Sequence, residues 1–546
     1  MKNIEKRALN QEIDTQLEKA TTILLTTYPG QDVELMIIER LLKKRGADIR
    51  HSEIDSFKQQ AISTLGTDHE IGFNDAEMGF LKAALADGRT GFKEFIESIP
   101  VDTPVCEDGT KMTNGGIQKK NIITTLGPLK GVNRTLYRDD ILNRSEYPLD
   151  DKIGLLEIDG SRSRYTQVFS WNDARLYAEL TEDDAVSTLN TLLGIEINKK
   201  QVAKVAQAVA ERYIKTVDNS ASEGQIDTEG AEEAVEGSEG QPSASVEAKG
   251  FLADKLRELD ASPDRDAIIQ AALDGKIDGA EGARADLSAL YLEADGTGVP
   301  GLRRELSDKG KDGGKAGTFE AKIGCAFRQG FTANGAPVLN DGNIVRMPNT
   351  TKYTGTTGKI DEFRPQFAEF AAFNGMHSAD QLVFLSDGAR WLKNSQLSLC
   401  PGAICIVDLY HAAEHLDDII DTLRFHSPEK RKEFVDTCRH LLELGDIAQL
   451  TTLIRGKKNH SNENTVEKKL AYFENNADRM RYGLFRAVGL FIGSGVMEAA
   501  CKTIVGKRLK NAGMHWSKKN ANGVIALRCA ICSGEFNTPE VDPLAA

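Results

Sequence analysis

The spacing of hydrophobic residues changes along the chain and divides it into segments. Residues 1–100 place apolar side chains three and four positions apart, as in VELMIIERLLKK and EMGFLKAALADG, which predicts helices. Residues 101–156 change to shorter runs such as KNIITTLGPLKGVNRTLYRD, punctuated by Gly and Pro, which predicts a small β-rich module. Residues 157–216 return to helical spacing.

The segment LTEDDAVSTLNTLLGIEINKKQVAKVAQAVAERY predicts two helices joined by a short turn. Thr181 is positioned to cap the first helix, and Gly194 interrupts the pattern before a second helix begins near Asn198. This is the layout of a helix-turn-helix, a common DNA-binding unit. Two packed helices with no role in DNA binding explain the pattern equally well.

From residue 286 onward, predicted strands alternate with helices. SALYLEADG, KIGCAFRQ and the weaker GNIVRMPNT predict three strands, and DEFRPQFAEFAAFNG has helical spacing. QLVFLSDG predicts the next strand, followed by the helix-like ARWLKNSQL, and AICIVDLYH predicts a further strand that runs into a helix over 410–424. A helical stretch over 428–487 precedes a last helix that begins near Val496.

This order of elements is typical of a ribonuclease-H-like domain whose last helix is delayed by an all-helical insertion. We therefore expect a multidomain α/β protein in which mostly helical N-terminal domains precede a core with a mixed sheet flanked by helices. The expected divisions are 1–100 (helical), 101–156 (β-rich), 157–216 (helix-turn-helix-like), 217–250 (acidic linker), 251–285 (helical connector), 286–424 (first part of the core), 425–487 (helical insertion) and 488–536 (last part of the core).

The distribution of charge matters more than the net value. The formal charge of -14 by itself argues against a nucleic-acid partner. Residues 217–249, however, hold nine acids and one lysine with almost no large apolar side chain, which predicts a flexible acidic linker. Residues 499–528 contain Lys and Arg but no Asp or Glu, as a phosphate-binding surface requires. A solvated basic helix face is the alternative.

Two further features concern the cellular compartment. The sequence contains no apolar run of about 18 residues, the length that predicts a membrane span. Its polar N-terminus lacks the apolar centre of a signal peptide, so a cytoplasmic protein is expected. Eight cysteines show no disulfide-type framework. Cys529 and Cys532 form the only C-x-x-C pair, and buried thiols on a helix are favoured over a zinc site, which needs a second pair of ligands.

Three acidic residues stand where chemistry is expected. Asp295 and Asp387 each precede a glycine where a predicted strand ends, the position at which α/β sheets bind ligands. For Asp295 alone, a turn-forming Asp-Gly is the alternative. Glu498 lies in the first turn of the last helix. Together they predict a site for two Mg²⁺ (or Mn²⁺) ions about 4 Å apart. Asp295 would bridge the ions, Asp387 would hold one, and Glu498 would hold the other.

Asp408 and His411 form an Asp-x-x-His element where a strand meets its helix. His411 is a candidate for contacting the scissile phosphate or for proton transfer, and bracing of the strand–helix junction is the alternative. Asp408 is a rival for the second metal position. Asp387 is preferred because its Asp-Gly follows a clearer buried strand. His415, one helical turn further on, is expected to be structural.

Several long segments resemble the ISKra family of bacterial insertion-sequence transposases over about 286–532. They are YLEADGTGVP, FEAKIG, FLSDGARWL, PGAICIVDLYHAAEHL and GLFIGSGVMEAACKTIVGKRLKNAGMHWS. The resemblance implies that Asp295, Asp387 and Glu498 are an Asp-Asp-Glu triad. It also implies Mg²⁺ dependence, a nucleoid-associated location, and as partners the terminal inverted repeats, target DNA and further copies of the chain in a dimeric or larger synaptic complex.

One departure from the family concerns residues 101–156. Relatives commonly carry a cysteine-rich, zinc-ribbon-like segment before the motif that is here Pro148-Leu149-Asp150. Only Cys106 remains in TPVCEDGTKM, and TLYRDDILNRSEYPLDDKIG has no cysteine. A zinc site needs about four ligands, so this module is expected to be a degenerate, metal-free form.

We therefore expect a transposase that hydrolyses a phosphodiester at an element end and then joins the freed 3′-hydroxyl to target DNA. Trp516 is expected either to stack on an unpaired base or to be a buried anchor. Two alternatives stay open, a non-catalytic DNA-binding regulator derived from a transposase and a metal-dependent nuclease without strand transfer. The residues expected to contact phosphates are Lys502, Lys507, Arg508, Lys510, Lys518 and Lys519.

Overall fold

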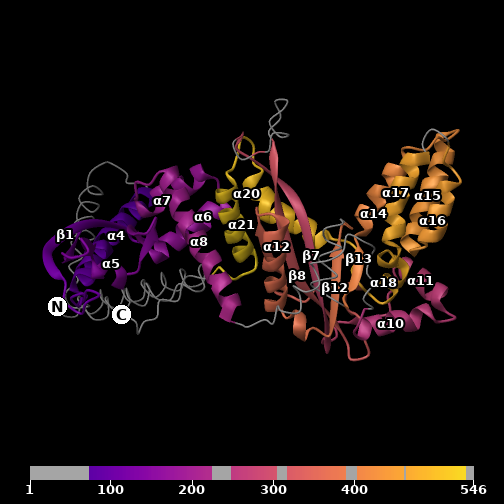
Figure 1. Ribbon diagram of the computed structural model, residues 1–546, viewed down its shortest axis with the longest axis horizontal. Helices are drawn as coiled ribbons and strands as arrows, with labels where there is room; N and C mark the ends of the chain where they lie inside the picture. Colours follow the sequence, from indigo (N-terminus) through magenta and orange to yellow (C-terminus); the bar gives the residue numbers. More distant parts are fainter. Residues whose placement is uncertain are drawn as a thin grey trace. The chain divides into compact units, whose positions relative to one another are not determined.

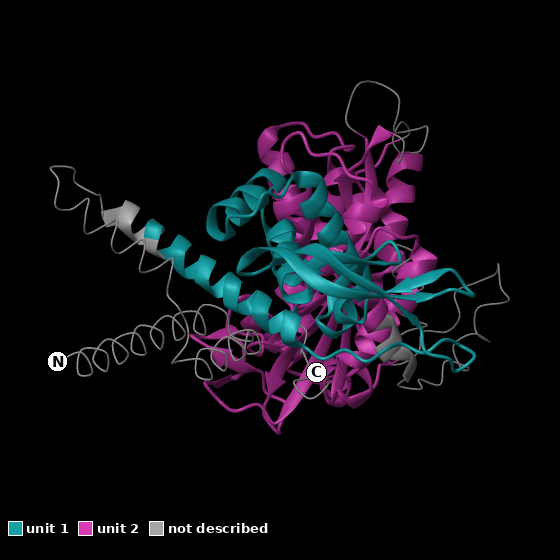
Figure 2. Cartoon of the chain, turned by 90° about the vertical axis from the view of Figure 1, so that its left-hand side faces the viewer, with its two compact units in different colours: residues 1–212, 534–546 teal, residues 213–533 magenta. Residues whose placement is uncertain are grey.

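The chain forms two compact units, which Figure 2 shows in different colours. Unit 1 comprises residues 1–212 and 534–546, and unit 2 comprises residues 213–533. The computed structural model describes residues 73–223, 248–303, 306, 317–388, 402–459 and 463–536, so the helices predicted before residue 73 lie outside the described part. Both units combine helices with sheets, and the predicted mixed α/β class is confirmed.

Unit 1 contains a five-stranded sheet in the order β3-β2-β1-β5-β4. The long helix α4 (Phe73–Ser98) packs against β2. Apolar side chains from the helix, the sheet and α5 form one core, which includes Ile96, Ile122, Leu129 and Leu149. The elements are β1 (Thr113–Thr124), β2 (Gly127–Asp139), β3 (Arg144–Glu146), α5 (Pro148–Lys152), β4 (Leu155–Ile158) and β5 (Ser161–Thr166).

Three helices follow the sheet: α6 (Gln167–Glu179), α7 (Glu182–Leu193) and α8 (Lys199–Glu223). The two predicted helix ends are confirmed, because the Thr181 side chain accepts a hydrogen bond from the backbone of Asp184, and Gly194 ends α7 with a φ of 61°. Since α8 continues to Glu223, residues 217–223 of the predicted linker are helical. The remainder, 224–247, lies outside the described residues.

The main sheet of unit 2 has the order β11-β8-β7-β12-β13 (Figure 1). Its first strand along the chain, β7, is central. β7 pairs antiparallel with β8, β8 pairs antiparallel with β11, and β12 and β13 run parallel to β7 on its other side. The strands are β7 (Leu287–Pro300), β8 (Thr318–Phe331), β11 (Lys352–Thr356), β12 (Gln381–Ser386) and β13 (Ile404–Val407).

The third strand of this sheet differs from the prediction. GNIVRMPNT contributes only β10 (Asn343–Ile344), which pairs with β9 (Val338–Asn340) in a separate sheet with β6 (Ala280–Glu281). Asp341 and Gly342 adopt positive φ angles of 50° and 72°, so Asp-Gly closes a local hairpin here. The strand that pairs with β8 is instead KYTGT, ten residues further on.

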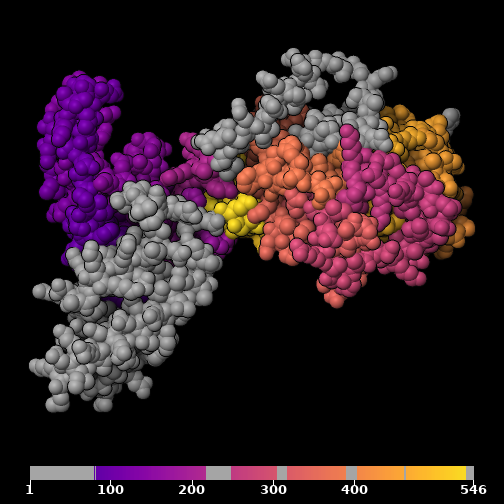
Figure 3. Space-filling model, turned by 90° about the horizontal axis from the view of Figure 1, so that it is seen from below, coloured from indigo at the N-terminus to yellow at the C-terminus, as the bar shows by residue number. Residues whose placement is uncertain are grey.

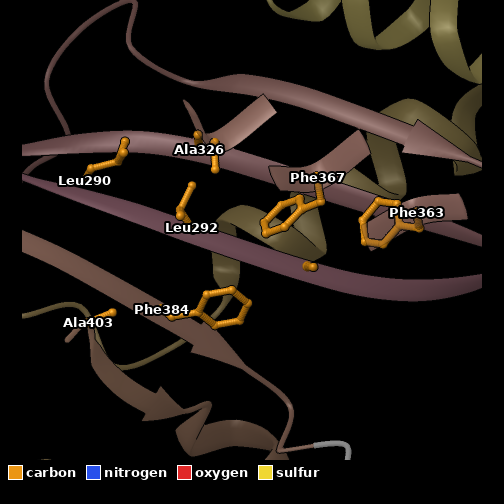
Figure 4. Close-up of a cluster of buried hydrophobic side chains, with 9 residues drawn as sticks. Leu290, Leu292, Ala326, Phe363, Phe367, Phe384 and Ala403 are labelled. Carbon is orange, nitrogen blue, oxygen red and sulfur yellow. The ribbon is translucent and has the colours of Figure 1, made fainter. Parts of the chain in front are cut away.

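The two faces of β7 have different surroundings because alternate residues of a strand point to opposite sides. Leu290, Leu292 and Ala294 join Phe363 and Phe367 of α12 (Ile360–Phe373) in an apolar core, which Figure 4 shows with Phe384 of β12. Tyr291, Glu293 and Asp295 therefore belong to the opposite face. There α19 (Gly495–Ala500) and the π-helical η5 (Cys501–Gly506) pack against β7.

The other described elements of unit 2 are helices. Among the described residues of 425–487 there is no strand. The predicted connector 251–285 packs on this helical part through α11 and α18. None of the described helices is both long and apolar enough to cross a membrane. The helices are α10 (Phe251–Asp260), α11 (Arg265–Leu273), α14 (Leu409–Ile420), α15 (Pro428–Leu444), α16 (Ile447–Arg455), α17 (Glu463–Asn475), α18 (Tyr482–Ala487), α20 (Lys507–Leu509) and α21 (Lys518–Cys532).

Candidate active site

Asp295 and Asp387 come from neighbouring parallel strands. The last pair of the β12–β7 register is Leu385 with Glu293, and Asp387 and Asp295 each follow this pair by two residues. The charge of Asp387 acts on Asp295. Asp387 directly follows β12, as predicted. Asp295, however, does not end its strand, because β7 stays paired with β8 as far as Pro300. The turn-forming interpretation of this Asp-Gly is therefore wrong.

The surroundings of Asp295 disfavour its charged form. Burial raises the pKa of Asp295, and the carboxylates of Asp387 and Glu320 raise it further. The backbone N–H of Gly296, 2.6 Å from Oδ1, and the imidazole of His411 oppose these effects. The Sγ of Cys501 lies 3.9 Å from Oδ2. A divalent cation held by oxygen ligands would relieve the repulsion between the carboxylates, so this donor set fits such an ion.

Glu498 lies in the first turn of α19, as predicted. Its exposed carboxylate pairs with Lys502, whose Nζ is 2.6 Å away. Cys501, which contacts Asp295, follows Glu498 by three residues, and residues so spaced lie on one face of a helix. Glu498 therefore stands about one helical turn from the contact with Asp295. In the described part of the chain, no three His, Cys, Asp or Glu side chains are arranged to hold a metal ion.

Asp408 connects three segments around this site. Its side chain is fully buried and caps α14, accepting hydrogen bonds from the backbone N–H of His411 (2.7 Å) and from that of Ser494. Its own N–H donates to the carbonyl oxygen of Ser386 at the end of β12 (2.8 Å). Burial raises the pKa of Asp408, but the hydrogen bonds from His411 and Ser494 outweigh burial and lower it overall. Both oxygens are thus engaged within the protein.

His411 carries a positive charge in these surroundings. Its Nδ1 lies 3.3 Å from Oδ1 of Asp408, and this hydrogen bond raises the pKa of His411 to about 9, against the opposing effect of burial. The carboxylates of Asp408 and Asp387 add to the rise. At neutral pH the imidazole is therefore protonated, which suits contact with a phosphate or donation of a proton. The bracing interpretation also applies, because the His411 backbone is part of the cap.

Replacing Asp408 with alanine should lower the free energy of unfolding by about 2–3 kcal/mol, because it removes a helix cap and leaves buried N–H groups without acceptors. Urea unfolding of the wild-type and variant chains measures the difference. Asp417→Ala is the matched control, since this carboxylate lies on the same helix but makes an exposed ion pair with Arg439. Its effect should stay below about 1 kcal/mol. Equal losses in the two variants would contradict the bracing role.

The helical part of unit 2 supports the segment that carries Asp387. The hydroxyl of Tyr472 on α17 donates to the Asp387 carbonyl oxygen at 3.0 Å, and the His415 ring lies 4.0 Å from the Tyr472 ring, centre to centre. This contact fits the structural role expected of His415. No pattern in the sequence points to Tyr472, because it lies 85 residues from Asp387. The helix predicted after Asp387 lies outside the described residues.

Glu293 is a further acidic residue that sequence reasoning missed. It precedes Asp295 by two residues and is fully buried on the same face of β7. Burial raises the pKa of Glu293 to about 8, and the charge of Asp408 adds to this rise. Hydrogen bonds from the thiol of Cys325, 3.7 Å away, and from the backbone of Met497 oppose it. A charged residue inside the apolar run ALYLEAD was the available signal.

The basic tract divides into exposed and buried residues. Arg508 and Trp516, both candidates for contacting DNA, are buried, with exposed fractions of 1% and 6%. The guanidinium lies 4.8 Å from the centre of the indole ring, and the indole N–H donates to the Leu509 carbonyl oxygen at 3.1 Å. Trp516 is thus a buried anchor, the second of the two predicted roles. The exposed lysines are Lys502, Lys507, Lys510, Lys518 and Lys519.

Lys510 brings one of these exposed charges to the acidic site. Its Nζ donates to Oγ1 of Thr297 at 2.7 Å, and Thr297 follows Asp295 by two residues on β7. The backbone of Trp516 forms two hydrogen bonds at the end of β7. Its N–H donates to the carbonyl oxygen of Pro300, and its carbonyl oxygen accepts from the N–H of Leu302, at 2.9 Å each. The tract is therefore fixed to the strand that carries Asp295. Cys529 and Cys532 both lie on α21. Cys529 is buried there, as predicted, whereas Cys532 is partly exposed.

No protein-family model matches the chain, and no curated protein matches its sequence. What the site can do is therefore derived from its residues. The charges of Asp387 and His411 act on Asp295, Glu498 lies one helical turn before the residue that contacts Asp295, and Lys510 binds Thr297 two residues after Asp295. This arrangement offers oxygen ligands for cations together with positive charges for an anionic substrate.

Proposed function

We propose that this chain is a metal-dependent DNA transposase of the ISKra type, with a ribonuclease-H-like catalytic core in unit 2. The proposal rests on Asp295 of β7 and Asp387, which directly follows the parallel neighbour β12 and whose charge acts on Asp295. The strand order of the sheet supports the ribonuclease-H-like core: three antiparallel strands come first along the chain, and two strands parallel to the central one follow.

In this proposal Asp295, Asp387 and Glu498 would hold two Mg²⁺ or Mn²⁺ ions. Glu498 would do so after its carboxylate leaves Lys502. When bound, such ions lower the pKa of an attacking hydroxyl and stabilise the leaving oxygen. Asp408 is assigned a supporting role instead, because its oxygens already accept hydrogen bonds from His411 and Ser494.

The other side chains of the site position the substrate. The imidazolium of His411 and the ammonium of Lys510 flank the carboxylates, where each can bind a phosphate oxygen. The hydrogen bonds of Asp408 hold the start of α14 and the segment before α19 in fixed positions, so that both halves of the site stay aligned. Fixed charges and orientation supply most of the rate enhancement in reactions of this class.

The proposed partners are the terminal inverted repeats, target DNA and further copies of the chain in a dimeric or larger complex at the nucleoid. The test is incubation of the purified chain with labelled duplexes that carry the DNA flanking its gene, in the presence of Mg²⁺ or Mn²⁺. Both cleaved and joined products are expected. Cleavage without joining would identify a nuclease, and binding without cleavage would identify a non-catalytic regulator.

A further inference from the structure

The hairpin of β1 and β2 in unit 1 has a composition that the active site does not account for. Residues 109–138 contain no Asp or Glu. Acid-free stretches that carry several cations attract polyanions, because no carboxylate within them competes for the cations. The six cations of this stretch are Lys111, Lys119, Lys120, Lys130, Arg134 and Arg138.

Two of the six cations serve the fold and four face solvent. Lys120 and Arg134 both bind the buried carboxylate of Asp150, at 2.9 and 2.6 Å. The other four are exposed, and in the described part of the chain none of their side chains forms an ion pair. These four, which we call the ribbon cations, are Lys111, Lys119, Lys130 and Arg138.

The hairpin also has the shape of a ribbon that can enter a groove. Its turn is anchored in the core of unit 1 by Ile122 and Leu129, whereas residues 113–119 of β1 are all exposed. β1 pairs with β5 only where Ile123 meets Tyr165, so the first half of β1 has no strand on that side among the described residues. Figure 2 shows unit 1, which contains the hairpin, in teal, and Figure 3 shows the indigo surface of the first described elements of the chain, α4 included, as a narrow lobe.

The helix-turn-helix-like pair of the same unit is less suited to bind phosphates. At the start of α8, Lys199 pairs with Asp183 at 2.6 Å, and Lys204 pairs with Asp159 at 2.6 Å. These lysines must leave their carboxylates before they can bind a phosphate, whereas the ribbon cations need not. The ribbon is therefore the better candidate for contact with a nucleic acid.

We propose that the β1–β2 ribbon of unit 1 is an arm that binds duplex DNA, with the ribbon cations on phosphates. A two-stranded ribbon fits the major groove of B-form DNA, where exposed polar side chains such as Asn114 and Gln118 of β1 can reach base edges. The arm is separate from the acidic residues that we propose to cut DNA, and its binding does not require that they do so.

The test compares the wild-type chain with the Lys119→Gln, Lys130→Gln, Arg138→Gln triple variant. Binding to a short fluorescent DNA duplex is followed by anisotropy in EDTA over a series of salt concentrations. Each lost phosphate contact removes about 0.9 from the slope of log K against log salt, so the slope should fall in magnitude by about 2–3. Affinity at low salt should fall at least about tenfold.

Two controls make the result specific. The first control is a triple variant that removes three exposed lysines from the helical part of unit 2: Lys430→Gln, Lys432→Gln and Lys468→Gln. It should leave the slope unchanged. The second control is a triple variant that keeps the three positive charges: Lys119→Arg, Lys130→Arg and Arg138→Lys. It should retain DNA binding. An unchanged slope in the glutamine triple variant, or an equal change in the helical control, would overturn the proposal. Because EDTA prevents metal-dependent cleavage, the result is independent of whether the acidic site cuts DNA.

Discussion

Asp295→Asn and Asp387→Asn are each expected to reduce metal-dependent DNA cleavage by about 10³-fold or more. Asparagine keeps the size of the side chain and one oxygen, but it removes the negative charge that attracts a divalent cation. The charge of Asp387, which directly follows β12, acts on Asp295 of the neighbouring β7, so loss of either carboxylate should disable the site. Initial rates of cleavage of a labelled duplex at saturating Mg²⁺ measure the effect.

Glu320→Gln provides the matched control for this experiment. Glu320 lies on β8, where it pairs with Gly298 of β7. Its charge contributes to the raised pKa of Asp295, but its exposed carboxylate pairs with Lys322 at 2.9 Å. Its replacement should leave cleavage near the wild-type rate. DNA binding in EDTA should be similar in all three variants and the wild-type chain. Near-wild-type cleavage by Asp295→Asn would rule out Asp295 as a ligand of the catalytic metal.

Glu293→Gln is expected to stabilise the protein strongly at alkaline pH. The pKa of Glu293 is about 8 in the folded chain against an ordinary value of 4.5, so the folded state binds this proton more tightly than the unfolded state. The free energy of unfolding therefore falls as pH rises from about 4.5 through about 8. Glutamine cannot ionise and avoids this loss. Above pH 8 the variant should be more stable by roughly 3–5 kcal/mol, and the difference should shrink toward pH 4.5.

Urea unfolding of both chains at pH 5 and pH 9, without divalent metal, measures this change. Glu320→Gln, an exposed carboxylate on the neighbouring strand, controls for the loss of one negative charge. A difference between wild type and Glu293→Gln that is the same at both pH values would show that Glu293 is not held in its protonated form by burial.

Several local features of the fold could be predicted because their causes lie within a few residues. The caps at Thr181 and Gly194 depend on side chains and backbone angles at the helix ends themselves. The position of Asp387 after a buried strand and of Glu498 in a first helical turn follow from hydrophobic periodicity next to glycines. These features place two of the three acids.

Other features depend on partners far along the chain, which periodicity does not reveal. Asp408 is engaged by Ser494, 86 residues later, so sequence alone left it a rival metal ligand. The strand at Asp295 continues past the glycine because β8 pairs with it beyond that point. The absence of acids from residues 499–528 predicted exposed positive charges, and the lysines of this tract are exposed. The burial of Arg508, by contrast, depends on its packing against Trp516.

The central claim is that Asp295 and Asp387 together hold divalent metal for DNA cleavage. Its most direct test is titration of Mn²⁺ into the DNA-bound wild-type chain and into the Asp295→Asn, Asp387→Asn double variant, with free Mn²⁺ measured by electron paramagnetic resonance. The wild-type complex is expected to remove Mn²⁺ from solution in excess of the variant complex. Equal Mn²⁺ binding by the two complexes would contradict the claim.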